Sequence, residues 1–261
     1  MVGVRLESKE RFDWLHMELG KANAIGPDFL RAFAAVWDQI DKPPQSGVAR
    51  PLLLTGQGSA FSAGLELPAL MGTPRAELAV FLGAFHRMVL RLACLGRPTI
   101  AVVNGHAVAG GAVLALACDV RIAARTVAGS DKPLLFGLNE SAIGLPFPLA
   151  AQVIVERALG GPAGAADAML SGELVSAERA LAWRAVHRVV AADELTAVAE
   201  AEALRYAAAT AAAAKTIKAA LTRDIAPLLD DPTDESVFLD AWFAPGTQSK
   251  LSIVVARLKA R

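Results

Sequence analysis

Two glycine-rich bends of the chain offer bare backbone of the kind that binds an oxyanion. Gly110 and Gly111 open an apolar run that ends near residue 118 and follows a β-branched strand at residues 100–103. Glycine lets a ligand approach the backbone, and the first N–H groups of a helix have no partner within it, so they favour negative charge. A second glycine-punctuated loop, residues 56–67, follows a short apolar strand in the same way. The alternative interpretation is a glycine pair that only lets a helix pack tightly on a strand.

One carboxylate stands alone among apolar neighbours. Glu140 lies in a loop-rich segment, residues 136–148, together with Leu138, Ile143 and Leu145. Burial among such side chains raises the pKa of a carboxyl group towards the operating pH, which suits it to take up and return a proton. The alternative is a solvated loop carboxylate or a salt-bridge partner.

Other catalytic signatures are not supported by the sequence. The loop at 56–64 approaches a dinucleotide fingerprint, but Phe61 occupies the position of the third glycine. Neither Ser59 nor Ser62 lies in a Gly-x-Ser-x-Gly sequence, so both are poor nucleophile candidates. The four histidines are scattered along the chain, and we therefore expect no metal site.

Hydrophobic periodicity predicts mixed strands and helices followed by a helical tail. Apolar residues at helical spacing predict amphipathic helices over residues 26–40 and 75–95. Short apolar runs predict strands, and alanine-rich helices dominate after residue 193. The predicted strands lie at 51–55, 100–103, 119–123, 133–136 and 186–190, after a hairpin within 1–19. Further helices are predicted at 148–159, 162–170 and 177–183, and helical segments of the tail near 233–243 and 247–258.

The amino-acid composition limits which binding partners and which cellular compartment are expected. The 26 basic and 26 acidic residues balance, which argues against a nucleic-acid-binding protein. Cys94 and Cys118 lie in apolar helical patterns, which suits reduced thiols and a cytoplasmic protein. Residues 99–118 are nearly apolar enough for a membrane span, but Asn104, His106 and three glycines interrupt them. We therefore expect no association with a membrane.

Four separated blocks of the sequence resemble the crotonase (enoyl-CoA hydratase/isomerase) superfamily. They are FSAGLEL at 61–67, NGHAVAGG at 104–111, LALACDVRIA at 114–123 and FGLNESAIG at 136–144. The blocks stand in the family's order and at its spacing, and the similarity extends over the helical tail.

The resemblance implies an α/β fold, a spiral of ββα units whose C-terminal helices pack against neighbouring subunits. Residues 1–192 would then form the spiral core with an acyl-CoA site, and residues 193–261 a helical trimerisation region. It also implies that the backbone N–H groups of Leu65 and Gly110 hold the thioester oxygen of an acyl-CoA. The residues that it places along the substrate are Ser62, Ala63, Gly64, Gly111, Val113 and Lys21.

The same resemblance bears on the reaction. Hydratases of this superfamily use two glutamates to activate water, and Val113 stands where the first of them is found, whereas Glu140 retains the second. The block around Glu140 resembles Δ3,Δ2-enoyl-CoA isomerases, in which an apolar residue likewise replaces the first glutamate. We therefore expect Glu140 to move a proton from C2 to C4 of a 3-enoyl-CoA through an oxyanion-stabilised enolate.

Several alternatives stay open at this point. Hydration, thioester hydrolysis or decarboxylation can use the same acyl-CoA site, and a non-catalytic acyl-CoA-binding trimer is a further possibility. Coenzyme A enters as part of the substrate, so no separate cofactor is expected. The expected partners are an acyl-CoA thioester and further copies of the chain in a homotrimer or hexamer.

Overall fold

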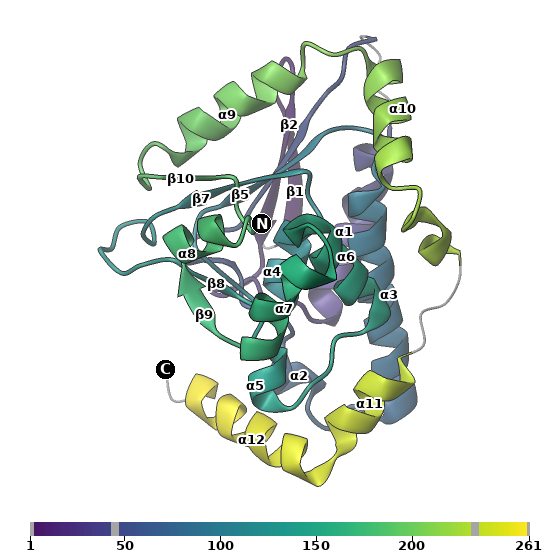
Figure 1. Cartoon of the computed structure of the whole chain (residues 1–261), viewed down its shortest axis with the longest axis vertical. Helices are drawn as coiled ribbons and strands as arrows, with labels where there is room; N and C mark the ends of the chain where they lie inside the picture. Colours follow the sequence, from purple (N-terminus) through teal and green to yellow (C-terminus); the bar gives the residue numbers. More distant parts are fainter. Residues whose placement is uncertain (1–2, 43–46, 231–234, 260–261) are drawn as a thin grey trace.

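Successive strands of this protein divide between two sheets. The computed structural model describes residues 3–42, 47–230 and 235–259. One sheet has six strands in the order β1-β2-β3-β5-β7-β10, and the other has four in the order β4-β6-β8-β9. Three times in succession, one strand joins the larger sheet, the next joins the smaller sheet and a helix follows (Figure 1). This is the expected spiral of ββα units.

The larger sheet is mostly parallel, and its central strands are buried. Its strands are β1 (Gly3–Ser8), β2 (Asp13–Glu18), β3 (Leu52–Thr55), β5 (Thr99–Val103), β7 (Val120–Ala124) and β10 (Arg188–Val190). β1 and β2 form an antiparallel hairpin, and β2, β3, β5, β7 and β10 run parallel to one another. Parallel strands are covered on both faces, which explains why β3 and β5 are continuous apolar runs rather than alternating ones.

The smaller sheet consists of four strands of three residues each. They are β4 (Ala60–Ser62), β6 (His106–Val108), β8 (Leu135–Gly137) and β9 (Leu174–Ser176). β6 pairs in parallel with β4 and with β8, and β9 is antiparallel to β8. Periodicity predicted β8 approximately but not β4, β6 or β9, because three residues carry too little alternation to be recognised.

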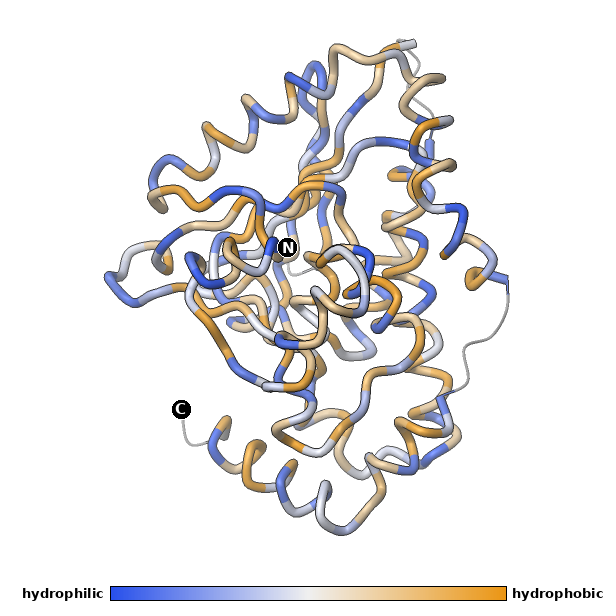
Figure 2. The backbone as a smooth tube through the Cα atoms, in the orientation of Figure 1, coloured by the Kyte–Doolittle hydropathy of each residue, from blue (hydrophilic) through white to orange (hydrophobic). Residues whose placement is uncertain are grey.

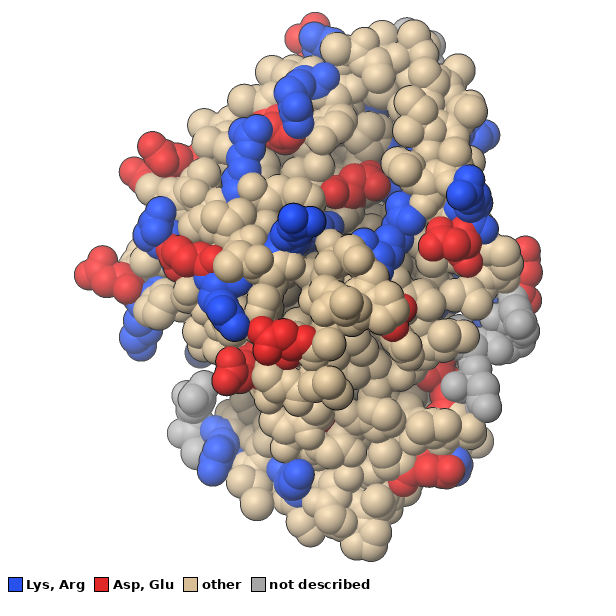
Figure 3. Space-filling model, in the orientation of Figure 1, with Lys and Arg blue, Asp and Glu red and all other residues tan. Residues whose placement is uncertain are grey.

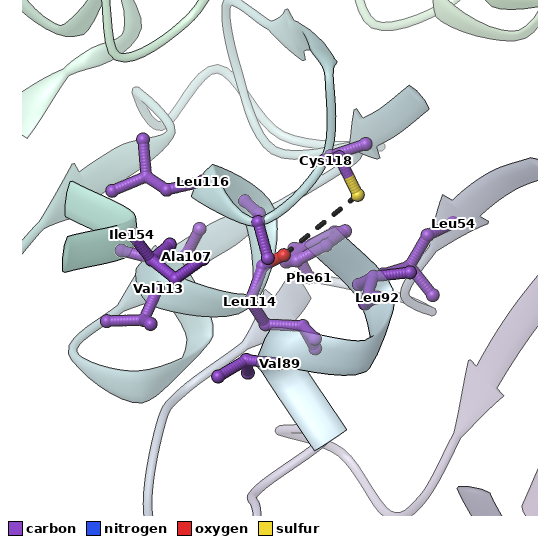
Figure 4. Close-up of a cluster of buried hydrophobic side chains, with 14 of the residues drawn as sticks. Leu54, Phe61, Val89, Leu92, Ala107, Val113, Leu114, Leu116, Cys118 and Ile154 are labelled. Atoms are coloured by element: carbon purple, nitrogen blue, oxygen red, sulfur yellow. Dashed lines mark hydrogen bonds between the residues drawn. The ribbon is translucent and has the colours of Figure 1, made fainter. Parts of the chain in front are cut away.

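The helices that lie between the strands bury their apolar faces against the sheets or against one another. They are α1 (Pro27–Ile40), α2 (Leu67–Leu70), α3 (Arg75–Ala93), α4 (Gly110–Leu116), α5 (Glu140–Ile143), α6 (Leu149–Leu159), α7 (Pro162–Ser171) and α8 (Ala177–Ala182). α4 is too short to be stable alone. Its side chains Val113 and Leu114 are almost completely buried, and they lie in one cluster with Phe61, Val89 and Ile154 (Figure 4). Tertiary packing therefore holds the helix that begins at the glycine pair.

The C-terminal helices surround the core from two ends. They are α9 (Leu195–Tyr206), α10 (Ala211–Leu221), the 3₁₀ helix η1 (Ala226–Leu229), α11 (Ser236–Phe243) and α12 (Pro245–Lys259). α9 packs on β3, β5 and β7, so it covers the large sheet just beyond the expected boundary at residue 192. α12 runs beneath α2 and α5 (Figure 1). The tail helices alternate between hydrophilic and hydrophobic stretches (Figure 2).

Acidic and basic side chains are interspersed on the face drawn in Figure 3, with broad uncharged areas between them. Within the described ranges, no helix combines the length and apolar character that crossing a membrane requires. Both cysteines are free thiols.

Candidate active site

The loop that carries Leu65 pairs with the segment that precedes α1. Ile25 and Leu65 form a parallel β-bridge, in which the Ile25 N–H donates to the Gly64 carbonyl at 2.8 Å. The Glu66 N–H in turn donates to the Ile25 carbonyl at 2.9 Å. Successive peptide groups of an extended chain point to opposite sides, so the N–H of Leu65 points away from Ile25. Among the described residues it has no hydrogen-bond acceptor.

Gly64 brings this amide beside the second one. Its φ of +80° lies in the left-handed region that favours glycine. A Cβ atom at this position would lie 2.7 Å from the Val108 carbonyl oxygen and 3.2 Å from the Gly110 nitrogen. Only glycine fits between these backbone atoms, and Leu65 follows it directly. The structure thus brings together the two loops that carry the expected donors.

The unusual backbone conformation of Ala109 sets the direction of the second amide, that of Gly110. Ala109 has φ +51° and ψ −126°, a conformation that costs a residue with a side chain roughly 1–3 kcal/mol. The N–H of Ala109 donates to the Gly137 carbonyl at 2.8 Å, whereas the Gly110 N–H has no acceptor among the described residues. Gly111 packs on Ser62, because a Cβ atom there would overlap the Ser62 carbonyl oxygen. Both loops therefore require glycine for close approach.

Glu140 follows β8, the strand next to β6 in the smaller sheet. Val108 of β6 pairs with Gly137 of β8. Gly110 follows Val108 by two residues, and Glu140 follows Gly137 by three, so both come shortly after the same paired position. Glu140 is the first residue of α5 and is 9% exposed. Its Oε2 atom is buried and has no hydrogen-bond partner among the described residues. This burial raises the pKa of the Glu140 carboxyl group to about 7.

Apolar side chains occupy the remaining walls. The side chain of Phe85 would lie 3.3 Å from a Cβ atom on Gly110, and that of Ile25 would lie 3.5 Å from it. Val113 is 1% exposed and lies beside Ile154 (Figure 4). The position at which the resemblance places the first glutamate of a hydratase is therefore apolar and buried here.

A cavity of about 580 Å³ opens on the other side of the Leu65 loop. Lys21, Ala22 and Glu66 line it, and Lys21 is exposed. Its floor is tied to the loop, since the Ala63 N–H donates to the Ala22 carbonyl at 3.0 Å. The Glu66 carboxylate lies against Gly26 at the start of α1. Burial, together with the negative charge of Asp28, raises the pKa of Glu66.

Of the residues expected along the substrate, some are exposed and others are not. Ala63 and Lys21 are exposed, whereas Gly64, Gly111 and Val113 are buried in the packing described above. Ser62 is 0% exposed, and its hydroxyl bonds within the protein. Within the described ranges, no group of His, Cys, Asp and Glu side chains is arranged to hold a metal ion.

Asn23 is a residue of this site that the sequence analysis missed. It is completely buried with φ +44°, a conformation that asparagine tolerates better than most residues. Its side chain accepts from the Leu19 N–H at 2.8 Å and donates to the Ala60 carbonyl at 3.2 Å. The sequence shows only an asparagine in the connection between the predicted hairpin and the helix at 26–40. Its partner Ala60 is 37 residues away, so no local pattern indicates the contact.

A groove larger than the cavity described above lies elsewhere on the described part of the chain. A groove of about 990 Å³ runs between α1, α3, η1 and α11, with Phe33, Trp37 and Met88 among its lining residues. Neither Leu65, Gly110 nor Glu140 lines it. The Leu65 and Gly110 loops and Glu140 therefore lie apart from the lining of this groove.

Comparisons with known proteins identify relatives of this chain. The family model described as Enoyl-CoA hydratase/isomerase matches residues 16–236. A Thermus thermophilus protein assigned by name to the enoyl-CoA hydratases is 36% identical over 193 residues, which cover 69% of this chain and 69% of that protein. A crotonyl-CoA hydratase of Syntrophomonas wolfei is 30% identical over 193 residues, covering 73% and 70% of the two chains. The crystal structure of human mitochondrial Δ3,Δ2-enoyl-CoA isomerase superposes with a TM-score of 0.86 at 26% identity, covering 98% of both chains.

Proposed function

This chain belongs to the enoyl-CoA hydratase/isomerase family, and we propose that it moves a double bond of an acyl-CoA thioester from the Δ3 to the Δ2 position. Glu140 is the acid and base of this proposal, and the amides of Leu65 and Gly110 are its oxyanion donors. The observation that carries the proposal is Glu140 itself, a buried carboxylate with an unpartnered oxygen and a pKa of about 7. A group of this pKa can both remove and return a proton near neutral pH.

The proposed reaction needs one proton carrier and one oxyanion site. Glu140 removes a proton from C2 of the 3-enoyl-CoA, and the electron pair of the broken C–H bond forms a dienolate. The negative charge on the thioester oxygen is stabilised by the Leu65 and Gly110 N–H groups. Glu140 then gives the same proton to C4, which leaves the conjugated 2-enoyl-CoA. Val113 cannot hold or activate a water molecule, which favours proton return over hydration.

A direct assay separates this proposal from its alternatives. We expect 3-hexenoyl-CoA to be converted to the 2-enoyl thioester, with a rise in the ultraviolet absorbance of the conjugated product. Hydration is the second candidate, because two of the similar relatives are named as hydratases. It predicts instead that the absorbance of added crotonyl-CoA falls. Binding of both thioesters without any absorbance change would overturn the isomerase proposal and favour a non-catalytic acyl-CoA-binding protein.

The pH dependence of the rate follows from the raised pKa of Glu140. As a base, Glu140 must be ionised in the free enzyme, so we expect kcat/KM for 3-hexenoyl-CoA to fall tenfold per pH unit below the pKa of about 7 and to level off above it. Steady-state rates across that range test this expectation. Binding of hexanoyl-CoA, which has no double bond to move, serves as the control for pH effects on affinity. A rate independent of pH below neutrality would contradict the assignment.

The assembly is a proposal of the same kind. We propose a homotrimer or hexamer in the cytoplasm, with residues 193–261 supplying contacts between subunits. Exposed apolar side chains on α10, namely Ile217 and Leu221, support this proposal.

A further inference from the structure

Ser62 lies at the point where the two oxyanion loops meet. It is the last residue of β4, it is 0% exposed, and it stands two residues before Gly64. Its carbonyl oxygen packs against Gly111, the residue that follows the second donor. One residue thus contacts both loops from a buried position.

The hydroxyl of Ser62 is fully used within the protein. It donates to the Asn23 carbonyl at 2.8 Å and accepts from the Gly64 N–H at 3.3 Å. Asn23 is itself held by its side-chain bonds to Leu19 and Ala60. The hydroxyl therefore links the Gly64 N–H to a rigid, buried part of the chain rather than to the substrate.

These bonds fix the orientation of the Leu65 N–H. Gly64 is anchored at both ends, because its N–H donates to Ser62 and its carbonyl accepts from Ile25 at 2.8 Å. In a trans peptide the N–H of Leu65 points opposite to the Gly64 carbonyl. A glycine at φ +80° has wide conformational freedom unless both of its polar groups are held. Loss of the Ser62 anchor would leave the peptide that carries the Leu65 N–H held only by the pairing with Ile25, and Gly64 could then change its φ more easily.

We propose that Ser62 is a positioning residue that orients the Leu65 amide towards the oxyanion. The proposal rests on the proposed function, since it concerns the same two donors. Ser62 touches no substrate atom in this scheme and acts only through Gly64. Its hydroxyl thereby preorganises one donor before the substrate binds, which is the source of most oxyanion stabilisation.

The test compares Ser62→Ala with a matched loss of a buried hydroxyl elsewhere. Thr222 is 2% exposed and donates to the Lys218 carbonyl at 2.8 Å, so Thr222→Ala removes an equivalent bond in the tail. We expect Ser62→Ala to lower kcat for 3-hexenoyl-CoA by about 10- to 100-fold with KM changed little, below the ~10²–10³-fold cost of losing a donor outright. Thr222→Ala is expected to keep the wild-type kcat.

A spectroscopic measurement tests the role of Ser62 without relying on the isomerisation rate. Acetoacetyl-CoA ionises at C2, and its enolate has an ultraviolet band of its own, so the bound enolate fraction reports on the oxyanion donors directly. We expect this fraction to be at least fivefold lower in Ser62→Ala than in wild type. Equal bands or equal kcat values would overturn the role of Ser62 alone. A wild type that binds acetoacetyl-CoA without any enolate band would overturn the oxyanion site, and both proposals with it.

A second variant covers the case in which Ser62→Ala does not fold. Ser62→Cys keeps nearly the same size and a weaker donor. We expect the enolate fraction of Ser62→Cys to lie between those of wild type and of Ser62→Ala. A cysteine variant with the wild-type fraction and the wild-type kcat would overturn the proposal.

Discussion

Replacing Glu140 by glutamine is expected to lower isomerase activity by at least about 10²–10⁴-fold while making the folded chain more stable at pH 8. Glutamine keeps the size of the side chain but cannot take the C2 proton. The variant should still bind acyl-CoA, because the amides of Leu65 and Gly110 belong to the backbone. Rates with 3-hexenoyl-CoA and denaturant unfolding curves of both proteins measure the two effects.

The gain in stability follows from the pKa of Glu140. Its value of about 7 in the folded chain exceeds the ordinary 4.5, so the folded state binds more protons than the unfolded state between these pH values. The contribution of the protonated group to stability is complete below pH 4.5 and is lost as the pH rises through 7. The loss amounts to about 3 kcal/mol. We therefore expect Glu140→Gln to gain most of this free energy at pH 8 and little of it at pH 4.5.

Glu66 provides the matched control. It follows Leu65 directly and its pKa is also raised, but its carboxylate lies against Gly26 and lines the cavity that contains Lys21. Glu66→Gln should keep the wild-type rate within about twofold, well inside the effect expected of a proton carrier. A Glu140→Gln variant with undiminished rate would remove Glu140 from the mechanism, and equal losses in both variants would point to a general electrostatic effect.

The parts of the fold that the sequence predicted are those with long periodic signals. α3 and β5 carry strong apolar patterns, and each was predicted to within about two residues of its observed bounds. The glycine pair at 110 also marked the start of α4 correctly. By contrast, α5 was expected as loop, because its four residues are too few to show a helical period. The expected helix near 233–243 is observed as α11 from Ser236, and residues 231–234 lie outside the described residues.

The site shows the same division between local and tertiary information. The motif around Gly110 could be recognised because its residues are adjacent in the chain. The direction of the Leu65 N–H depends on Ile25, 40 residues earlier, and the Ser62 hydroxyl depends on Asn23, 39 residues earlier. No local pattern encodes these pairings, so Ser62 was expected to line the substrate rather than to hold the backbone. The burial of Glu140 agrees with its apolar neighbours, but those neighbours alone left a solvated loop carboxylate as the alternative.

Replacing Gly64 by alanine should damage both the oxyanion site and the fold. The new Cβ would lie 2.7 Å from the Val108 carbonyl oxygen and 3.0 Å from the Ala109 Cβ, so β6 and the Leu65 loop must separate. The φ of +80° adds backbone strain. We expect a loss of about 2–4 kcal/mol in the free energy of unfolding and a fall of ~10²–10³-fold in kcat, since one donor moves away from the oxyanion.

Gly160 separates the two causes of this effect. Its φ of +85° is nearly the same, but a Cβ atom there would meet nothing within 4 Å. Gly160→Ala therefore introduces the backbone strain without the close approach, and it should cost about 1 kcal/mol with kcat unchanged. Denaturant unfolding and rates with 3-hexenoyl-CoA compare the two variants. If Gly64→Ala lost no more activity than Gly160→Ala, the contact between the Leu65 loop and Gly110 would not be needed for the reaction, and an oxyanion held by two converging amides would be the wrong mechanism for this chain.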